Sequence, residues 1–187
     1  MPQIHVSLFL FLIASRSFAQ NNDDSILWKE NIKLKWSYFM APSNVYNNHA
    51  AHTYCIIDYA LRPTKDSLKC DVQTKFLKSK SWVKKKDENE NLLQHEQGHF
   101  DIREIYTRML RKKIKESKFH RNNLQEEFDH LESEIHVELD LKQEEYDKET
   151  NFSINQEKQN EWIKKIAVEL KGLKDFENTE VVVPLKN

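Results

Sequence analysis

Helical periodicity extends from about residue 91 to residue 173 and restricts the second half of the chain to one kind of structure. Apolar residues recur at three- and four-residue steps in stretches that begin near Asn91, Asn123 and Asn155. Glycine, which weakens helix interiors, occurs only twice among the 187 residues, whereas lysine and glutamate are frequent. We therefore predict three long helices.

The part of the chain before these helices has the alternating pattern of strands. Residues 32–39 (IKLKWSYF) alternate apolar and polar side chains, which predicts a half-buried strand. Residues 52–61 and 67–76 also alternate, and the Pro-containing segment 62–66 between them predicts a turn. The pattern allows the second arm to continue through Val83.

The order of these elements predicts an α+β fold. A small antiparallel sheet with a hairpin comes first, and a bundle of long helices follows. Residues 181–183, three valines, fit either a short strand or an unstructured tail. The length predicts a single domain over residues 20–187.

Two cysteines lie in the arms of the predicted hairpin. If the chain turns near residues 62–63, Cys55 lies opposite Cys70, and an oxidising compartment would allow a disulfide. Two unpaired, half-buried thiols fit the same spacing. Metal binding by this pair is disfavoured, because structural zinc sites usually have four ligands.

The amino end has the features of an export signal. Val6 to Ala14 form an apolar run of nine residues, too short for the ~20 residues of a membrane-spanning helix. Small residues at Ser17 and Ala19 predict a signal peptide over residues 1–19 with cleavage after Ala19. A buried amino-terminal strand is the alternative, because no lysine or arginine precedes the apolar run. The protein is then secreted or periplasmic, and no other stretch is predicted to span a membrane.

Charge and composition exclude several classes of protein. The 29 basic and 30 acidic residues nearly cancel, so no basic excess is available for binding a phosphate backbone, and nucleic acid is not an expected partner. With 2 glycines and 4 prolines, the chain is not collagen-like and not a flexible linker.

The first predicted helix contains the motif that indicates chemistry. His95-Glu96-Gln97-Gly98-His99 matches H-E-x-x-H, in which the two histidines are one turn apart and project from one helix face. Both imidazoles can bind one zinc ion, whose bound water has a pKa of about 7. Glu96 is then placed to act as general base on that water and to protonate the leaving amine.

Gly98 adds a physical indication. A glycine inside a helix costs about 1 kcal/mol relative to alanine, so something is expected to approach closely there: a strand, a substrate backbone or the metal. Two other interpretations stay open, namely a surface helix that happens to hold two histidines and a metal site without hydrolytic activity.

Catalytic zinc sites usually have three protein ligands, and spacing alone does not identify the third. Each histidine elsewhere is more often an exposed polar residue than a ligand. The candidates are the carboxylates of the second helix and His49, His52, His120, His130 and His136.

Several segments together resemble one bacterial family, known as domain of unknown function 922 and described as predicted secreted zinc-dependent proteases. The most characteristic stretch is Leu92–Ile102, which contains the motif. The others are Leu34–Trp36 with Phe39 and Pro42, Lys80–Val83, Tyr146–Asn151, and Asn155, Gln159 and Trp162. The resemblance covers nearly all of the chain after the signal peptide and implies a zincin-like domain.

One residue departs from the family pattern. The family's downstream motif has a histidine two residues after its threonine, where this chain has Phe152. If that histidine is a ligand, Asp147 is the best local substitute, since carboxylates also bind zinc. Tyr146 is either an oxyanion-stabilising residue or a buried core tyrosine.

The leading functional hypothesis is an exported zinc metallopeptidase that hydrolyses a protein or peptide in the cell envelope or outside the cell. In it His95, His99 and Asp147 bind zinc and Glu96 is the catalytic base. The alternative is a non-enzymatic envelope or secreted binding protein on the same scaffold, which Phe152 favours. A helical interaction module without metal is disfavoured, because it leaves the placement of His95, Glu96 and His99 unexplained.

Overall fold

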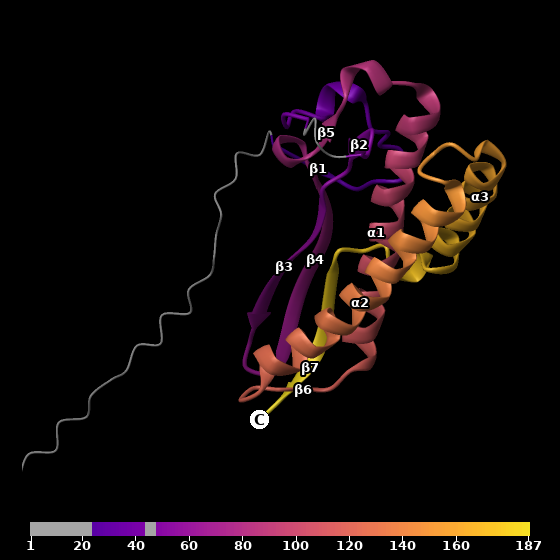
Figure 1. The fold of residues 1–187 in the computed structure, drawn as a ribbon. Helices are drawn as coiled ribbons and strands as arrows, with labels where there is room; N and C mark the ends of the chain where they lie inside the picture. The colour runs from indigo at the N-terminus through magenta and orange to yellow at the C-terminus, as the bar shows by residue number, and fades with distance from the viewer. Residues whose placement is uncertain (1–23, 44–47) are drawn as a thin grey trace, which may run out of the picture.

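Three long helices form the second half of the molecule, as the periodicity predicts. A computed structural model describes residues 24–43 and 48–187, so the predicted signal peptide and its cleavage after Ala19 lie outside the described residues. The helices are α1 (Glu90–Glu116), α2 (Leu124–Thr150) and α3 (Gln156–Gly172). Together with a small sheet they confirm the α+β class (Figure 1).

Asparagine side chains define the ends of these helices. Asn89 accepts a hydrogen bond from Leu92 N at 2.9 Å before α1, and Asn155 accepts one from Lys158 N at 3.1 Å before α3. Both are N-caps, which satisfy backbone N–H groups that have no partner within the helix. Asn151 ends α2 with φ 46°, a left-handed conformation that asparagine tolerates better than most residues. The caps therefore set where α2 stops and α3 begins.

The main sheet is built around one long strand, β4 (Ser67–Leu77). Strand β3 (Cys55–Pro63) pairs with it antiparallel, and β1 (Ser25–Leu27) and β7 (Glu180–Lys186) also pair with it antiparallel, at opposite ends. The short strand β6 (Phe119–His120) lies parallel to β7. Residues 181–183 therefore belong to a strand, and the chain returns to the sheet after its helices.

The β3–β4 hairpin forms where it is predicted, but its register differs. The turn lies at residues 64–66, where Thr64 N donates to Ser67 O at 2.7 Å, and not at residues 62–63. Cys55 therefore pairs with Phe76, and Cys70 with Leu61. Six residues along a strand correspond to about 20 Å, so the predicted placement of Cys55 opposite Cys70 is wrong. Both cysteines are free and buried, and burial raises the pKa of the Cys70 thiol to about 11.

The strand predicted over residues 32–39 is wrong, although its burial pattern is right. Leu34 is buried and Lys33 and Lys35 are exposed, as alternation requires. The segment has no partner strand among the described residues and ends in a 3-10 turn at Trp36–Tyr38. Leu34 N donates to the side chain of Gln97 on α1 at 2.8 Å, so this segment is held by a helix and not by a sheet.

A second, two-stranded ribbon lies apart from the main sheet. It pairs β2 (Ala51–His52) with β5 (Trp82–Val83), and a 3-10 turn at Lys78–Lys80 separates β5 from β4. The second hairpin arm therefore does not continue through Val83. The ribbon lies at the end of the molecule where α1 begins and α2 ends (Figure 1).

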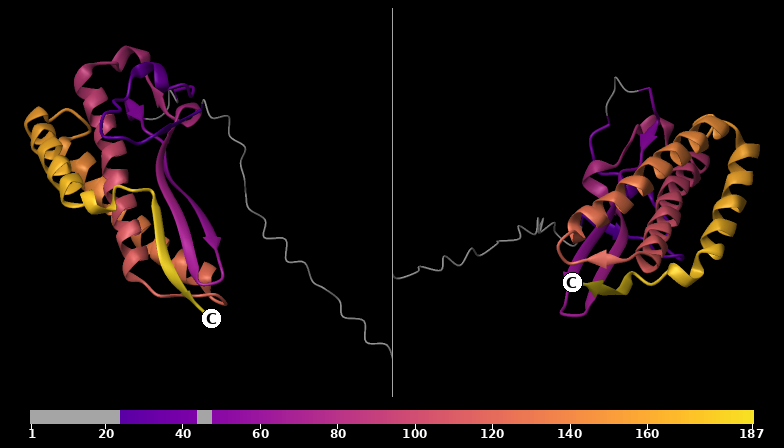
Figure 2. Two further views of the ribbon diagram at one scale, coloured as in Figure 1. Left: turned by 180° about the vertical axis from the view of Figure 1, so that it is seen from behind. Right: turned by 90° about the horizontal axis from the view of Figure 1, so that it is seen from below.

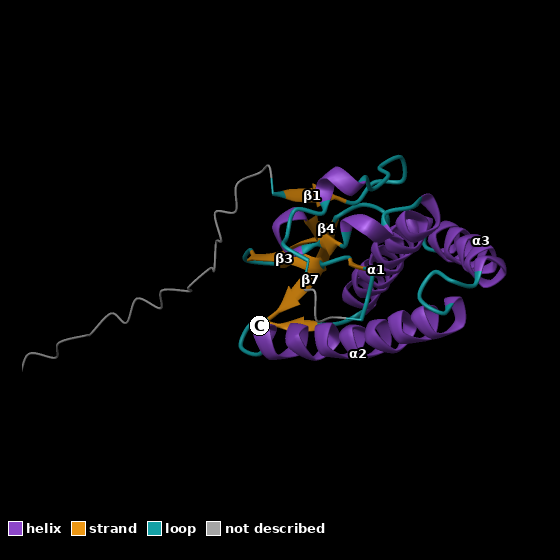
Figure 3. Ribbon diagram, turned by 45° about the horizontal axis from the view of Figure 1, so that its top comes forward, coloured by secondary structure: helices purple, strands orange, loops and turns teal. Residues whose placement is uncertain are grey.

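Helix α1 is the centre of the molecule. The sheet lies along one side of it, and α2 and α3 pack against it from other sides (Figures 2 and 3). One apolar core joins these layers, including Leu68 and Val72 of β4, Ile102 and Leu110 of α1, and Ile135 of α2. Among the described residues, no helix is both long and apolar enough to cross a membrane. Because α1 is antiparallel to α2, the first turns of α1 lie beside the last turns of α2.

Candidate metal site

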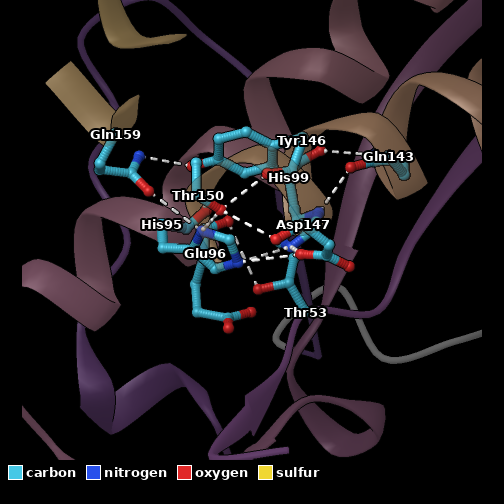
Figure 4. A network of polar contacts seen from close by, with 9 residues as sticks. All are labelled: Thr53, His95, Glu96, His99, Gln143, Tyr146, Asp147, Thr150 and Gln159. Carbon is cyan, nitrogen blue, oxygen red and sulfur yellow. Dashed lines mark hydrogen bonds and ion pairs between the residues drawn. The ribbon is translucent and has the colours of Figure 1, made fainter. Parts of the chain in front are cut away.

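Three potential ligand atoms converge between the start of α1 and the end of α2. Asp147 Oδ1 lies 3.0 Å from both His95 Nε2 and His99 Nε2. The two imidazole nitrogens are 3.1 Å apart. Figure 4 shows the three side chains pointing toward one another from the two helices. Within the described part of the chain, this is the group of histidine, cysteine and acidic residues that has the geometry of a metal site.

Two glutamines determine which nitrogen of each imidazole carries the proton. Gln143 Nε2 donates to the carbonyl of His99 at 3.1 Å, so its Oε1 must be the atom 2.5 Å from His99 Nδ1. An amide oxygen only accepts, and His99 Nδ1 is therefore the protonated nitrogen of the neutral ring. The Nε2 lone pair of His99 is left facing Asp147.

The same argument applies to His95. Tyr146 Oη donates to the carbonyl of His95 at 3.1 Å and accepts from Gln159 Nε2 at 2.6 Å. Gln159 Oε1 consequently faces His95 Nδ1 and accepts a hydrogen bond from it at 3.0 Å. In their neutral forms both histidines thus present unprotonated Nε2 atoms to one point, and partners of this kind orient metal-binding histidines in known sites.

The dimensions of this cluster fit a zinc ion. Ligand atoms about 2.0–2.2 Å from a tetrahedral zinc lie roughly 3.3–3.6 Å from one another, close to the 3.0–3.1 Å found here. Two imidazole nitrogens and one carboxylate oxygen are also a ligand set that zinc accepts, and three protein ligands are typical of catalytic sites. The residues present therefore fit zinc.

Glu96 is the acidic residue beside this cluster that is not part of it. Its side chain is only 4% exposed, and its Oε2 atom is buried with no hydrogen-bond partner in the described structure. A buried carboxylate oxygen without a partner is costly, so such atoms in native proteins usually serve a function. Glu96 lines the same cavity as His95, His99 and Asp147.

The charges of the cluster stabilise one another. Burial acts to raise the pKa of Asp147, but the hydrogen bonds that His95 and His99 donate to it when they are protonated outweigh this effect and hold that pKa well below its usual range. Burial acts to lower the pKa of His99, and the hydrogen bond and negative charge of Asp147 raise it overall. Asp147 is therefore ionised at neutral pH, as a metal ligand must be.

The cluster opens into a cavity of about 270 Å³. Residues 49–53, which include β2, line it together with residues of α1 and α2. Phe152 lies at the cavity with 48% of its surface exposed, and its ring is 5.2 Å from that of His49. The residue that departs from the family pattern is thus part of the cavity wall, and Asp147 is the third residue of the cluster.

Tyr146 explains the glycine of the motif. A Cβ atom at Gly98 would lie 2.2 Å from Tyr146 Oη, so the close approach predicted there is made by this side chain and not by a strand, a substrate or a metal. Tyr146 is fully buried and its ring stacks on that of His95 at 4.6 Å. Of its two predicted roles, the structure therefore agrees with a core tyrosine that positions His95.

We expect Gly98→Ala to destabilise the protein by about 1–3 kcal/mol, since Tyr146 must move away from its hydrogen bonds to relieve the overlap. Helix propensity alone predicts the opposite sign, a gain of about 1 kcal/mol. Urea unfolding followed by circular dichroism measures the difference. The control is Gly172→Ala, where an added Cβ meets nothing within 4 Å. A Gly98→Ala protein as stable as the native one would contradict the packing argument.

None of the other histidine candidates belongs to the cluster. His49 and His52 line the cavity, and burial lowers the pKa of His52. His120, His130 and His136 instead pair with glutamates elsewhere, namely Glu127, Glu134 and Glu132.

Sequence reasoning did not assign roles to Gln143 and Gln159. Gln143 precedes Asp147 by four residues, so helical spacing places both on one face of α2, and this was the available signal. No comparable spacing connects Gln159 on α3 with His95 on α1.

Comparison with known proteins identifies the family. The model of a family described as "Bacterial protein of unknown function (DUF922)" matches residues 39–153, more than half of the chain. The matched region contains the motif, Asp147 and Phe152, whereas the resembling residues before residue 39 and after residue 153 lie outside it. No curated protein and no solved structure matches significantly. The chain therefore belongs to the bacterial DUF922 family.

Proposed function

We propose that this protein is an exported zinc-dependent peptidase. The observation that carries the proposal is the convergence of three potential ligand atoms, from His95, His99 and Asp147, beside the unpartnered carboxylate oxygen of Glu96. A metal site alone does not require such an oxygen, but a hydrolytic site requires a general base. Export is supported by the amino-terminal sequence, with its short apolar run and small residues before the predicted cleavage point.

Zinc in this site would supply a Lewis acid that polarises a carbonyl group and lowers the pKa of a bound water to about 7. The side chains of the protein supply the rest. Glu96 would accept a proton from water in the cavity and donate it to the nitrogen of the departing amine. Gln143 and Gln159 hold the two imidazoles in one tautomer and orientation.

The non-enzymatic alternative depended on Phe152, which stands where the family pattern has a histidine. Asp147 supplies a third ligand atom within 3.0 Å of the other two, so the substitution does not leave the cluster incomplete. The unpartnered Glu96 oxygen also favours the enzyme, because a binding protein has no evident use for it.

The metal content of the purified protein tests this proposal. We expect about one zinc per chain in the native protein and far less in His99→Ala and in Asp147→Asn, because each variant leaves two protein ligands. Gln143→Leu removes the partner of His99 Nδ1 and is expected to weaken zinc binding by about 10- to 100-fold. His130→Ala, whose side chain is 73% exposed on α2, is the control and is expected to keep its zinc. A native protein that takes up no zinc when zinc is supplied would overturn the proposal.

A further inference from the structure

Arg103 lies on the wall of the cavity and has no partner for its charge. It follows His99 by one helical turn, so His95, His99 and Arg103 occupy one face of α1. Its Nε atom is buried without a hydrogen-bond partner, and no described residue forms an ion pair with its guanidinium within 4.0 Å. Arg103 is partly exposed, and its guanidinium remains charged at neutral pH without the carboxylate partner that such a group in a cavity wall usually has.

The acidic groups around Arg103 do not neutralise it. Asp140 on α2 lines the same cavity and attracts Arg103, but it forms no ion pair with it and its side chain is exposed to solvent. Asp147 belongs to the cluster already described, and Glu96 forms no ion pair with Arg103. The cavity therefore holds an unpaired cation beside the metal site, and its natural complement is an anion brought by a ligand.

We infer that Arg103 binds a carboxylate of the peptide substrate, an inference that rests on the proposed peptidase function. The planar guanidinium matches a carboxylate in a two-point hydrogen bond that also balances its charge, whereas a neutral peptide offers carbonyl oxygens that accept hydrogen bonds and leave the charge unpaired.

The spacing along α1 indicates where that carboxylate lies. The rise of a helix separates the backbones of His99 and Arg103 by about 6 Å, and one extended residue covers about 3.3–3.6 Å. The carboxylate therefore belongs to a residue one or two positions from the bond that is cleaved. Peptides carry carboxylates at their carboxyl terminus and on aspartate and glutamate, so the substrate is either cut near its end or cut beside an acidic residue.

Peptide binding measured by calorimetry tests the inference without turnover. The probes are one short apolar peptide with a free carboxyl terminus, its carboxamide, and a carboxamide with glutamate as its last residue. In the metal-free native protein and in the Glu96→Gln variant with zinc added, neither of which is expected to hydrolyse the peptides, we expect the carboxamide to bind about 10- to 100-fold more weakly than a carboxylate form. Which carboxylate form binds more tightly tells carboxyl-terminal recognition from recognition of an acidic side chain.

Variants connect the preference to Arg103. We expect Arg103→Gln to bind all three peptides equally, Arg103→Lys to retain part of the preference, and Asp140→Asn to strengthen it because a competing negative charge is removed. Lys112→Gln is the matched loss of one positive charge, at an exposed position of α1 outside the cavity, and is expected to change nothing. Circular dichroism verifies that each variant is folded.

The outcomes separate this inference from the proposed function. Equal binding of the three peptides by the native protein, no binding of any, or a preference that persists in Arg103→Gln would each overturn the carboxylate site. If the protein binds zinc but does not prefer carboxylate peptides, only the further inference is rejected. If the protein prefers carboxylate peptides but binds no zinc, the carboxylate site is supported and the proposed peptidase function is rejected.

Discussion

Replacing Glu96 by glutamine is expected to lower the rate of peptide hydrolysis by about 100- to 10,000-fold, the usual contribution of a general base. The amide is nearly isosteric with the carboxylate and cannot accept the proton. Because Glu96 is not one of the three converging residues, the variant is expected to keep its zinc. Cleavage of fluorescently labelled casein, with the metal content measured in the same samples, provides both values.

The control for this variant is Glu116→Gln, an exposed glutamate in the last turn of the same helix. It removes the same charge from α1 without touching the cavity and is expected to hydrolyse casein at the native rate. Equal rates for Glu96→Gln and the native protein would exclude Glu96 as the base. Zinc binding without hydrolysis in the native protein would instead identify a non-enzymatic member of the family.

Removing the charge of Glu104 is expected to destabilise the fold by about 3–5 kcal/mol, the usual cost of breaking a buried ion pair. Its Oε1 accepts from Arg108 Nε at 2.9 Å and from Arg111 Nη1 at 3.0 Å, and its Oε2 accepts from Thr74 Oγ1 of β4 at 2.7 Å. All four residues are at least 95% buried. Glu104→Gln would leave two buried guanidinium groups without their anion, and urea unfolding at neutral pH measures the loss.

This buried cluster also explains how α1 holds the sheet and the last third of the chain together. Arg111 donates to the carbonyls of Val72 in β4 and Phe176 after α3, both at 2.9 Å. The control is Glu161→Gln, which breaks the exposed pair with Lys158 and is expected to leave the stability nearly unchanged. Similar small losses in both variants would show that the cluster contributes little to stability.

Local features of the sequence predict the helices and part of the site. Each helix begins within a residue or two of the predicted start, because apolar spacing acts over a few neighbouring residues, and capping asparagines contribute at α1 and α3. The placement of His95 and His99 on one face of α1 follows from helical geometry alone. The motif therefore reveals half of the site without any knowledge of how the helices pack.

Strand pairing was less predictable, for a physical reason. Residues 32–39 alternate as a strand does, yet alternation reports only which side chains are buried and not what buries them. In the hairpin, a turn shifted by a few residues moved Cys55 from Cys70 to Phe76 without disturbing either arm. The same two strands can pair in several registers, so the register depends on the turn and on the side chains that pack against the hairpin.

By itself, the sequence determined the α+β class, the three helices and the pairing of two histidines with a glutamate on α1, because these depend on contacts within a few residues. The sequence and its family resemblance offered Asp147 as one candidate, and the tertiary structure decided that it is the third member of the cluster, that Tyr146 requires Gly98, and that Arg103 is left unpaired at the cavity. These features depend on the rotation of α2 about its own axis and on its position along α1. Many side-chain contacts distributed over the core determine that packing, so the spacing of residues within one helix does not predict it.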